Sequence, residues 1–135
     1  MSRIEIDLPY PPSVNNYWRS RSIGKGRKSF VSVYVTKEGK AFQEAVKAAM
    51  LSKFGSIKPD ERRMQVDIHA TMPDRRKRDV DNICKATLDG LTAAKLWVDD
   101  SQIDRLLVVR CGVLKPGGLH VVVRAIDEAK QLELI

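Results

Sequence analysis

Cysteine and histidine are scarce in this sequence of 135 residues. Its two cysteines, Cys84 and Cys111, are too few and too scattered to predict a disulfide framework or a zinc site. Its two histidines, His69 and His120, lie in strand-like patterns without a partner at ligand spacing, so neither predicts a zinc ligand or a general acid. We therefore expect both thiols to be plain core or half-core residues in a reducing compartment, the cytoplasm.

Long apolar runs are also missing. No stretch approaches the ~18 apolar residues that a membrane-spanning helix needs, and MSRIEIDLPYPP at the start lacks the apolar region of a secretory signal. No membrane partner is expected. The chain is still 43% hydrophobic, which is enough for one packed core. Its length is typical of a single domain, and we expect residues 1–135 to form one.

The spacing of the apolar residues predicts both strands and helices. Alternating patterns predict strands at residues 2–9, 30–35, 64–71, 105–114 and 119–126, with the KPGG segment as a hairpin-type turn between the last two. Helical periodicity covers residues 37–53, with Thr36 as the candidate N-cap, and resumes at Val80. The sequence therefore predicts a mixed α+β fold, in which two principal helices pack on a mainly antiparallel sheet. The tail after Asp127 is expected to be a frayed end.

Positive charge exceeds negative charge, with 24 Lys and Arg against 17 Asp and Glu and a net charge of +7. The segment 19–29, rich in Gly, Ser and basic residues, has no apolar periodicity and predicts an exposed loop. A second basic run directly precedes the second predicted helix. Two basic clusters on loops favour a nucleic-acid partner over a simply solvated surface. The residues expected to contact its phosphates are Arg19, Arg21, Lys25, Arg27, Lys28, Arg75, Arg76, Lys77 and Arg78.

Carboxylates follow the second basic cluster at once, in the stretch PDRRKRDVDNICK. Asp81 and Lys85 share one helix face, and Asp79 can turn toward the same ion only if it precedes the first full helical turn. Helix capping or an ordinary ion pair would explain these residues equally well, because acidic spacing alone is weakly specific. A Mg²⁺ ion held by hard carboxylate oxygens would let the acids and a phosphodiester share one site.

Three segments together resemble the RusA family of Holliday-junction resolvases. They are LPYPPSVNNYWR, HATMPDRRKRDVDNICKATLDGL and AKLWVDDSQI, and the similarity extends from about Ile4 to Ala125. The joint pattern D-x-D-N-x-x-K plus W-x-D-D is specific, whereas each piece alone is weak. One departure is Val14, which separates Ser13 from the asparagines and leaves the roles of Asn15 and Asn16 open.

The resemblance implies a homodimeric, Mg²⁺-dependent endonuclease that cuts four-way DNA junctions by paired nicks in opposing strands, in DNA recombination and repair. By motif, the essential acids and metal ligands fall on Asp79, Asp81 and Asp100, and the essential lysine falls on Lys85. The register of the W-x-D-D motif favours Asp100, and Asp99 is an almost equally good candidate for the same role. An acid of the family pattern also falls on Asp89, which is not assigned to catalysis.

Aromatic residues flank the first basic segment. Tyr17, Trp18 and Phe30 either stack on an opened branch point of the DNA or simply pack beneath the loop, and the sequence favours neither interpretation.

Three other functions remain to be distinguished. The first is a junction-binding or duplex-binding protein without metal chemistry. The second is a nuclease of the same chemistry that cuts flaps or replication forks. The third, a small-molecule phosphohydrolase, fits poorly with two basic clusters. Activity that is insensitive to salt would support it, because binding to a polyanion weakens steeply as salt rises.

Overall fold

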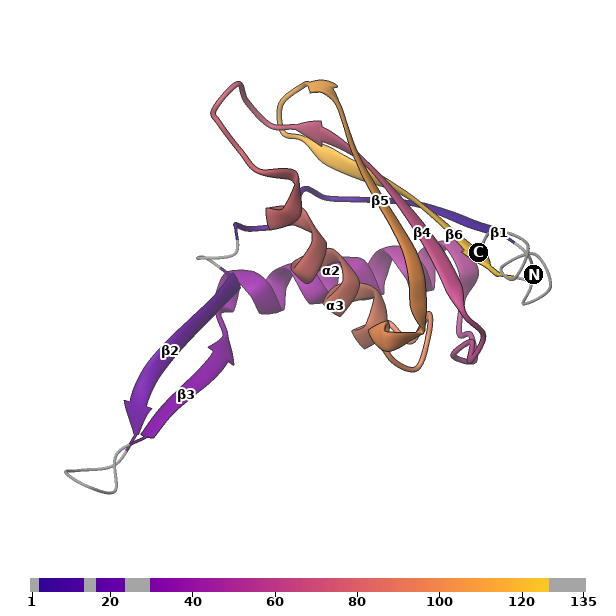
Figure 1. Cartoon of the computed structure of the whole chain (residues 1–135), viewed down its shortest axis with the longest axis horizontal. Coiled ribbons are helices and arrows are strands. Elements are labelled where there is room, and N and C mark those ends of the chain that lie inside the picture. Colours follow the sequence, from indigo (N-terminus) through magenta and orange to yellow (C-terminus); the bar gives the residue numbers. More distant parts are fainter. Residues whose placement is uncertain (1–2, 14–16, 24–29, 127–135) are drawn as a thin grey trace.

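The computed structural model describes residues 3–13, 17–23 and 30–126 (Figure 1). The predicted mixed α+β fold, with two principal helices on a mostly antiparallel sheet, is confirmed. No helix within these ranges is long and apolar enough to cross a membrane. The elements in chain order are β1 (Arg3–Leu8), β2 (Trp18–Ile23), β3 (Phe30–Val35), α2 (Lys37–Phe54), β4 (Met64–Met72), the 3-10 helix η2 (Val80–Ile83), α3 (Cys84–Ala93), the 3-10 helix η3 (Asp100–Gln102), β5 (Ile103–Val113) and β6 (Gly118–Ala125).

The main sheet has four strands in the order β1-β6-β4-β5. Strand β6 is antiparallel to both of its neighbours, and β5 is parallel to β4. Every second residue of β4, from Met64 to Met72, is buried and packs in one core cluster with apolar residues of α2 and α3. The intervening residues are only half-buried, so the helices cover one face of the sheet and leave the other face open.

The two last strands are not partners, because β4 lies between them. The predicted hairpin across the KPGG segment is therefore wrong, although the chain does reverse there. The Gly117 N–H donates to the Leu114 carbonyl over 2.7 Å, and Gly117 has a positive φ of 82°. The Leu114 N–H donates in turn to the Met72 carbonyl at the end of β4. A Pro-Gly turn specifies a chain reversal but not which strands pair afterwards.

The predicted loop at residues 19–29 is also partly wrong. Residues 19–23 belong to β2, which pairs with β3 in a hairpin that extends away from the helices and the main sheet (Figure 1). A projecting hairpin needs no apolar face, so its first strand lacks the alternation by which sequence reasoning recognises strands. The β-branched and aromatic residues of β3 supply the β propensity for the pair. Residues 24–29, like the tail from Asp127 onward, lie outside the described residues.

Tyr17 anchors the base of this hairpin. Its side chain is buried, its hydroxyl accepts a hydrogen bond from Gln43 Nε2 over 2.6 Å, and its carbonyl accepts from the Thr36 N–H. The packing interpretation of Tyr17 is therefore confirmed, whereas the side chains of Trp18 and Phe30 lie outside the described part of the chain.

Both predicted helices form, with one shift. Thr36 caps α2 as predicted, because its hydroxyl accepts from the Gly39 N–H over 3.1 Å. The second α-helix starts at Cys84 rather than at Val80, since η2 precedes it. Gly90 lies where α3 crosses α2, and a Cβ there would lie 3.1 Å from Val46 Cγ2. This close crossing holds the acid-bearing helix firmly on the core.

Candidate functional site

The basic loop, residues 73–79, connects β4 with η2 and is anchored at both ends. Arg78 Nη2 donates to Asp74 Oδ2 over 2.9 Å, and this hydrogen bond is the main cause of the lowered pKa of Asp74. The Arg78 guanidinium also lies over the Tyr10 ring, 5.7 Å from its centre. Arg78 is therefore committed to holding the loop, which leaves the side chains of Arg75, Arg76 and Lys77 exposed.

Strand β5 contributes a second anchor for this loop. The Arg110 guanidinium donates to the carbonyl of Arg78, the residue directly before Asp79. Sequence reasoning missed Arg110, since an arginine in a strand pattern gives no sign of the loop that it will reach.

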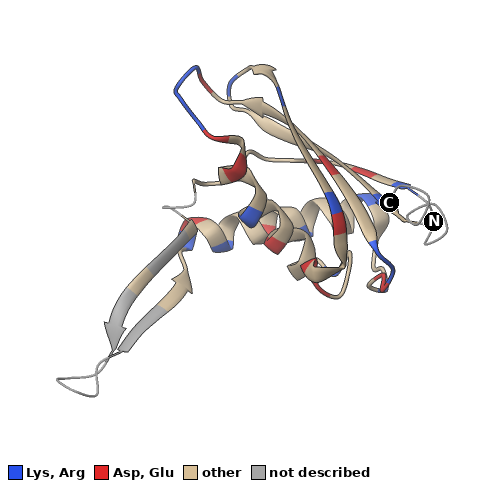
Figure 2. Cartoon of the chain, viewed as in Figure 1, with Lys and Arg blue, Asp and Glu red and all other residues tan. Residues whose placement is uncertain are grey.

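The first two acids are Asp79, the last residue of the basic loop, and Asp81, which follows it in η2. Asp79 has extended backbone angles, φ −84° and ψ 136°, and its side chain makes no cap hydrogen bond. The prediction that Asp79 precedes the first full turn is thus confirmed. Asp81 lies in η2, and Lys85 lies in the first turn of α3. Figure 2 shows this order along the ribbon, with the basic loop leading into the acidic and basic residues of η2 and α3.

Lys85, Asp89 and Asp100 form a second group. Lys85 Nζ lies 3.4 Å from Asp89 Oδ1. Burial raises the pKa of Asp89, the charge and hydrogen bond of Lys85 oppose this shift, and the nearby charge of Asp100 adds to it. No group of three acids among the described residues is arranged to hold an ion, so the structure does not bring the three predicted ligands Asp79, Asp81 and Asp100 together.

The two acids of the W-x-D-D motif have different surroundings. Asp99 is the N-cap of η3, and its carboxylate accepts from the Ser101 N–H over 3.2 Å. Hydrogen bonding to Ser101 lowers the pKa of Asp99. Asp100, the first residue of η3, is half-buried and close to Asp89. The capping role of Asp99 supports the choice of Asp100 as the candidate ligand.

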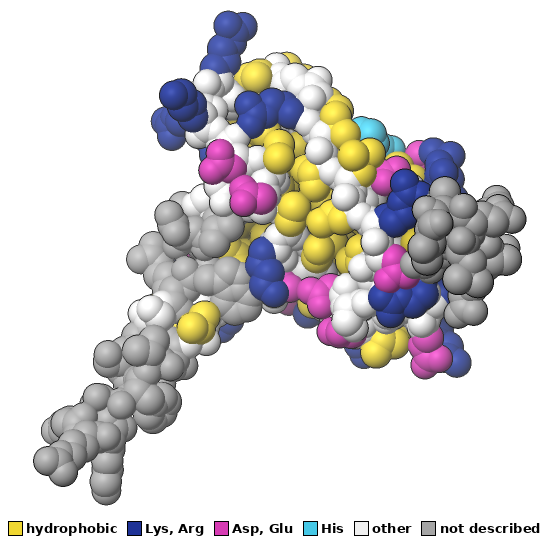
Figure 3. Space-filling view, in the orientation of Figure 1, with side chains coloured by type: hydrophobic (Ala, Val, Ile, Leu, Met, Phe, Trp, Pro, Cys, Tyr) yellow, Lys and Arg dark blue, Asp and Glu magenta, His cyan; other side chains and the backbone are white. Residues whose placement is uncertain are grey.

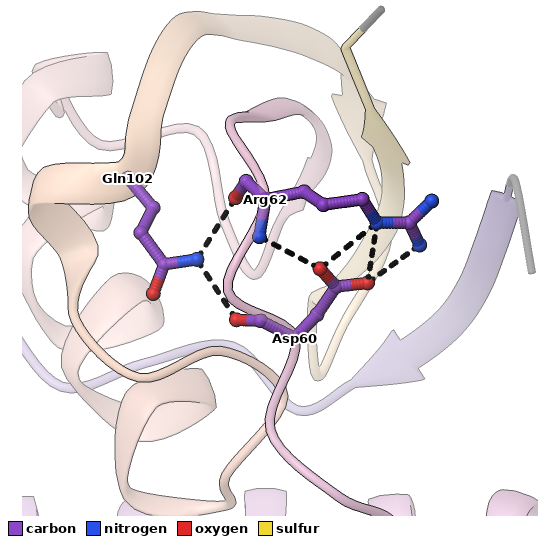
Figure 4. Close-up of polar contacts among 3 residues, drawn as sticks. All are labelled: Asp60, Arg62 and Gln102. Carbon is purple, nitrogen blue, oxygen red and sulfur yellow. Dashed lines mark hydrogen bonds and ion pairs between the residues drawn. The ribbon is translucent and has the colours of Figure 1, made fainter.

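Gln102 holds this acidic turn in place, and sequence reasoning missed it. Figure 4 shows its Nε2 donating to the carbonyls of Asp60 and Arg62, each over 2.8 Å. Its Oε1 accepts from the N–H groups of Val98 and Asp99, over 2.8 and 2.9 Å. The D-x-x-Q spacing of a capping box was the available sequence signal.

The described residues contain no group of three or more His, Cys, Asp or Glu side chains that is arranged to hold a metal ion. The donor chemistry of Asp79, Asp81 and Asp100 still fits Mg²⁺, which prefers carboxylate oxygens.

A family model described as "Endodeoxyribonuclease RusA" matches residues 9–124. The chain belongs to the RusA endodeoxyribonuclease family. It is 39% identical over 127 residues to the crossover junction endodeoxyribonuclease RusA of Escherichia coli strain K12, which covers 91% of this chain and 95% of that protein. The proteins of the same name from Enterobacteria phage 82 and Shigella sonnei are 37% and 38% identical, with the same coverage. The predicted resemblance is confirmed, and as a RusA-family member the chain is an endonuclease.

The predicted DNA contacts of this RusA-family chain stand at two places. Arg75, Arg76 and Lys77 project from the basic loop, whereas Arg78 is held by Asp74. In the hairpin, Arg19 and Arg21 belong to β2. The remaining three, Lys25, Arg27 and Lys28, lie outside the described residues.

Replacing Gln102 by Leu should destabilise this RusA-family fold. The change leaves two backbone N–H groups and two carbonyls, all in part-buried hydrogen bonds, without their partner, at a cost of about 2 kcal/mol in the free energy of unfolding. Urea unfolding followed by circular dichroism measures the loss. Gln65→Leu, on the open face of β4, is the matched control and should change little. An unchanged midpoint for Gln102→Leu would show that the amide does not hold the turn.

Asp89→Asn should stabilise the protein at neutral pH. Because the folded pKa of Asp89 is raised, the folded state keeps a proton that the unfolded state has lost, and stability falls as pH rises through that window. The asparagine removes this cost, so the melting temperature of the variant should exceed that of the parent at pH 7. The two melting temperatures should be equal below about pH 3.8, the ordinary pKa of an Asp side chain. Thermal melts across pH measure the difference. Glu44→Gln, exposed on α2, should show no such crossover.

Proposed function

We propose that this chain is a Mg²⁺-dependent, structure-specific endodeoxyribonuclease that resolves four-way DNA junctions by paired symmetric nicks. It acts as a single-domain protein in the cytoplasm, in DNA recombination and repair. The names of its relatives support the junction as substrate. The observation that carries the proposal is the placement of Lys85 between acids on an exposed helix face, directly behind the exposed cations of the basic loop.

Each group has a role in phosphodiester hydrolysis. Asp79, Asp81 and Asp100 would hold the Mg²⁺ ion, which when bound neutralises charge on the scissile phosphate and lowers the pKa of bound water. Lys85 stabilises negative charge on the phosphate as it develops. Asp89 orients the Lys85 ammonium from one turn further along the helix. It is a positioning residue rather than a catalytic one.

The cations bind the backbone of the branched DNA. Arg75, Arg76 and Lys77 grip phosphates beside the cut, and the basic residues of segment 19–28 contact the DNA at a second place. Contacts of this kind position the substrate without reading its bases, so the junction is chosen by its shape. Binding should weaken steeply as salt rises, which a small-molecule phosphohydrolase would not show.

Cleavage of a labelled synthetic four-way junction in Mg²⁺ tests the chemistry. We expect paired nicks from the parent, and a rate at least about a hundredfold lower from Asp79→Asn and from Lys85→Met. Asp67→Asn, on the open face of the sheet, is the matched control and should cut like the parent.

Each alternative gives a different result in the same assay. Tight junction binding without any cut would leave a binding protein. Faster cutting of flaps or forks at equal salt would leave a nuclease with another target. Equal cleavage by the parent and Asp79→Asn would contradict the assignment of the acids.

A homodimer completes the proposal, since two opposing nicks need two sites related by a two-fold axis. The candidate surface is β5, an edge strand of 11 residues with a neighbour on one side only among the described strands. Leu107 on this strand is 51% exposed and Leu114, directly after it, is 72% exposed, and Figure 3 shows hydrophobic side chains gathered on the adjoining face. A long apolar edge pairs readily with a second copy of itself.

Sedimentation of Leu107→Lys tests this surface. A charge on the edge should oppose pairing and convert the dimer to a monomer, while Leu51→Lys, exposed on α2, should remain a dimer. A parent that stays monomeric at all concentrations would contradict the homodimer. A dimeric Leu107→Lys would contradict β5 as its surface.

A further inference from the structure

Arg110 is an exposed residue of β5 that lies on the helix-covered side of the sheet. Val108 of the same strand packs against the core, and side chains two residues apart on a strand point to the same face. Arg110 also pairs in register with Ala70, which is buried on that face. Its side chain therefore starts on the side of the sheet where η2 lies next to β5.

The strand is irregular directly after Arg110. Ala70 pairs with Arg110, but Thr71 pairs with Gly112, so Cys111 is an extra residue in β5. Gly112 has a φ of 132°, a conformation that L side chains rarely adopt. Bulges of this kind bend a strand and change the direction of the side chains beside them. The bulge thus favours a side chain that leaves the sheet and reaches the basic loop.

The contact that Arg110 makes there is with the backbone. Its guanidinium donates to the Arg78 carbonyl, which belongs to the planar peptide group that leads into Asp79. The carbonyl of Asp79 is held as well, because it accepts from the Asn82 N–H over 3.1 Å. Both peptide groups around the Asp79 Cα are thus fixed by hydrogen bonds, which sets the direction of its side chain.

The loop cations are held by other contacts. The Arg78 side chain is bound by Asp74 and lies over the Tyr10 ring, and neither contact involves Arg110. Within the described residues, no side-chain cap hydrogen bond holds Asp79. Loss of the Arg110 guanidinium would therefore leave the loop in place and would free the peptide group before Asp79.

We propose that Arg110 is a positioning residue for the metal ligand Asp79, whose carboxylate it directs toward the ion from the edge strand β5. This role rests on the proposed function, which gives Asp79 to Mg²⁺. Groups that orient a metal ligand from behind typically change metal affinity by roughly 10- to 100-fold when they are removed.

Binding of Mn²⁺, a paramagnetic substitute for Mg²⁺, tests this role without DNA or cleavage. Electron paramagnetic resonance of the free ion measures the affinity. Arg110→Met should weaken binding about tenfold, because methionine has no N–H donor for the Arg78 carbonyl. Arg110→Lys should restore most of the affinity, since lysine keeps a donor on a long side chain. Arg105→Met, which removes the same charge from an exposed position of β5, is the matched control and should bind like the parent.

A double-mutant cycle shows whether Arg110 acts through Asp79. Asp79→Asn should weaken Mn²⁺ binding at least as much as Arg110→Met does, and the double variant should be no weaker than Asp79→Asn alone. Junction binding in EDTA gives a second measurement. Arg110→Met should keep the salt dependence of the parent, because the loop cations that meet the phosphates stay in place.

The results separate this role from the function on which it rests. Unchanged Mn²⁺ binding in Arg110→Met, beside weakened binding in Asp79→Asn, would overturn the positioning role alone. Unchanged binding in both variants would overturn the assignment of Asp79 to the metal as well. Additive losses in the double variant, or a shallower salt dependence in Arg110→Met, would show that Arg110 acts independently of Asp79, as a direct phosphate contact does.

Circular dichroism establishes that each variant is folded. Arg110→Gln, whose amide does not extend as far as the guanidinium, carries the test if Arg110→Met does not fold.

Discussion

One buried amide, that of Gln102, determines where the chain turns between α3 and β5. Its two donors and its acceptor satisfy four backbone groups from two segments that are far apart in the sequence. Trp97, also buried, fixes the preceding residues through its Nε1, which donates to Thr92 Oγ1 over 2.6 Å. Arg63 adds a hydrogen bond to the carbonyl of Ser101. The position of Asp100 is therefore set by the core beneath it, although the carboxylate itself faces the surface region of the site.

Electrostatics work against folding at this site. The half-buried carboxylate of Asp89 is destabilised by burial and by the charge of Asp100, and Lys85 offsets only part of this cost. Acids on neighbouring helices that repel one another gain nothing from this proximity unless a cation joins them. A helix that served stability alone would place neutral residues here. The arrangement is understandable as a site that exchanges some stability for the ability to bind charged groups.

Sequence periodicity predicted the elements that pack on the core and missed those that do not. The alternation in β4 and the helical stripe of α2 are direct results of burial, so both were found with boundaries close to the observed ones. The strand β2 was missed because a projecting hairpin buries no regular face. The placement of β4 between β5 and β6 was missed because pairing is decided by the whole sheet rather than by the turn.

The candidate sites show the same division. Asp79, Asp81 and Lys85 could be proposed from the sequence because a single helix and its approach carry them, so their spacing follows from the order of residues along the chain. The buried amide of Gln102 and the anchor from Arg110 depend on partners remote in sequence. The contact of His120 with Asp7 was missed for the same reason, since only the pairing of β1 with β6 brings the two residues together.

The parallel pairing of β4 and β5 has a consequence for folding. Parallel neighbours need a long crossover, and residues 73–102, which carry the basic loop and every candidate acid, form that crossover. Closing such a loop costs chain entropy, which the contacts between β4 and β5 must offset. Arg110 reaches the basic loop only once β5 has paired with β4. The geometry of the basic loop therefore depends on completion of the sheet, through a contact that joins residues 32 positions apart, and not on α3 alone.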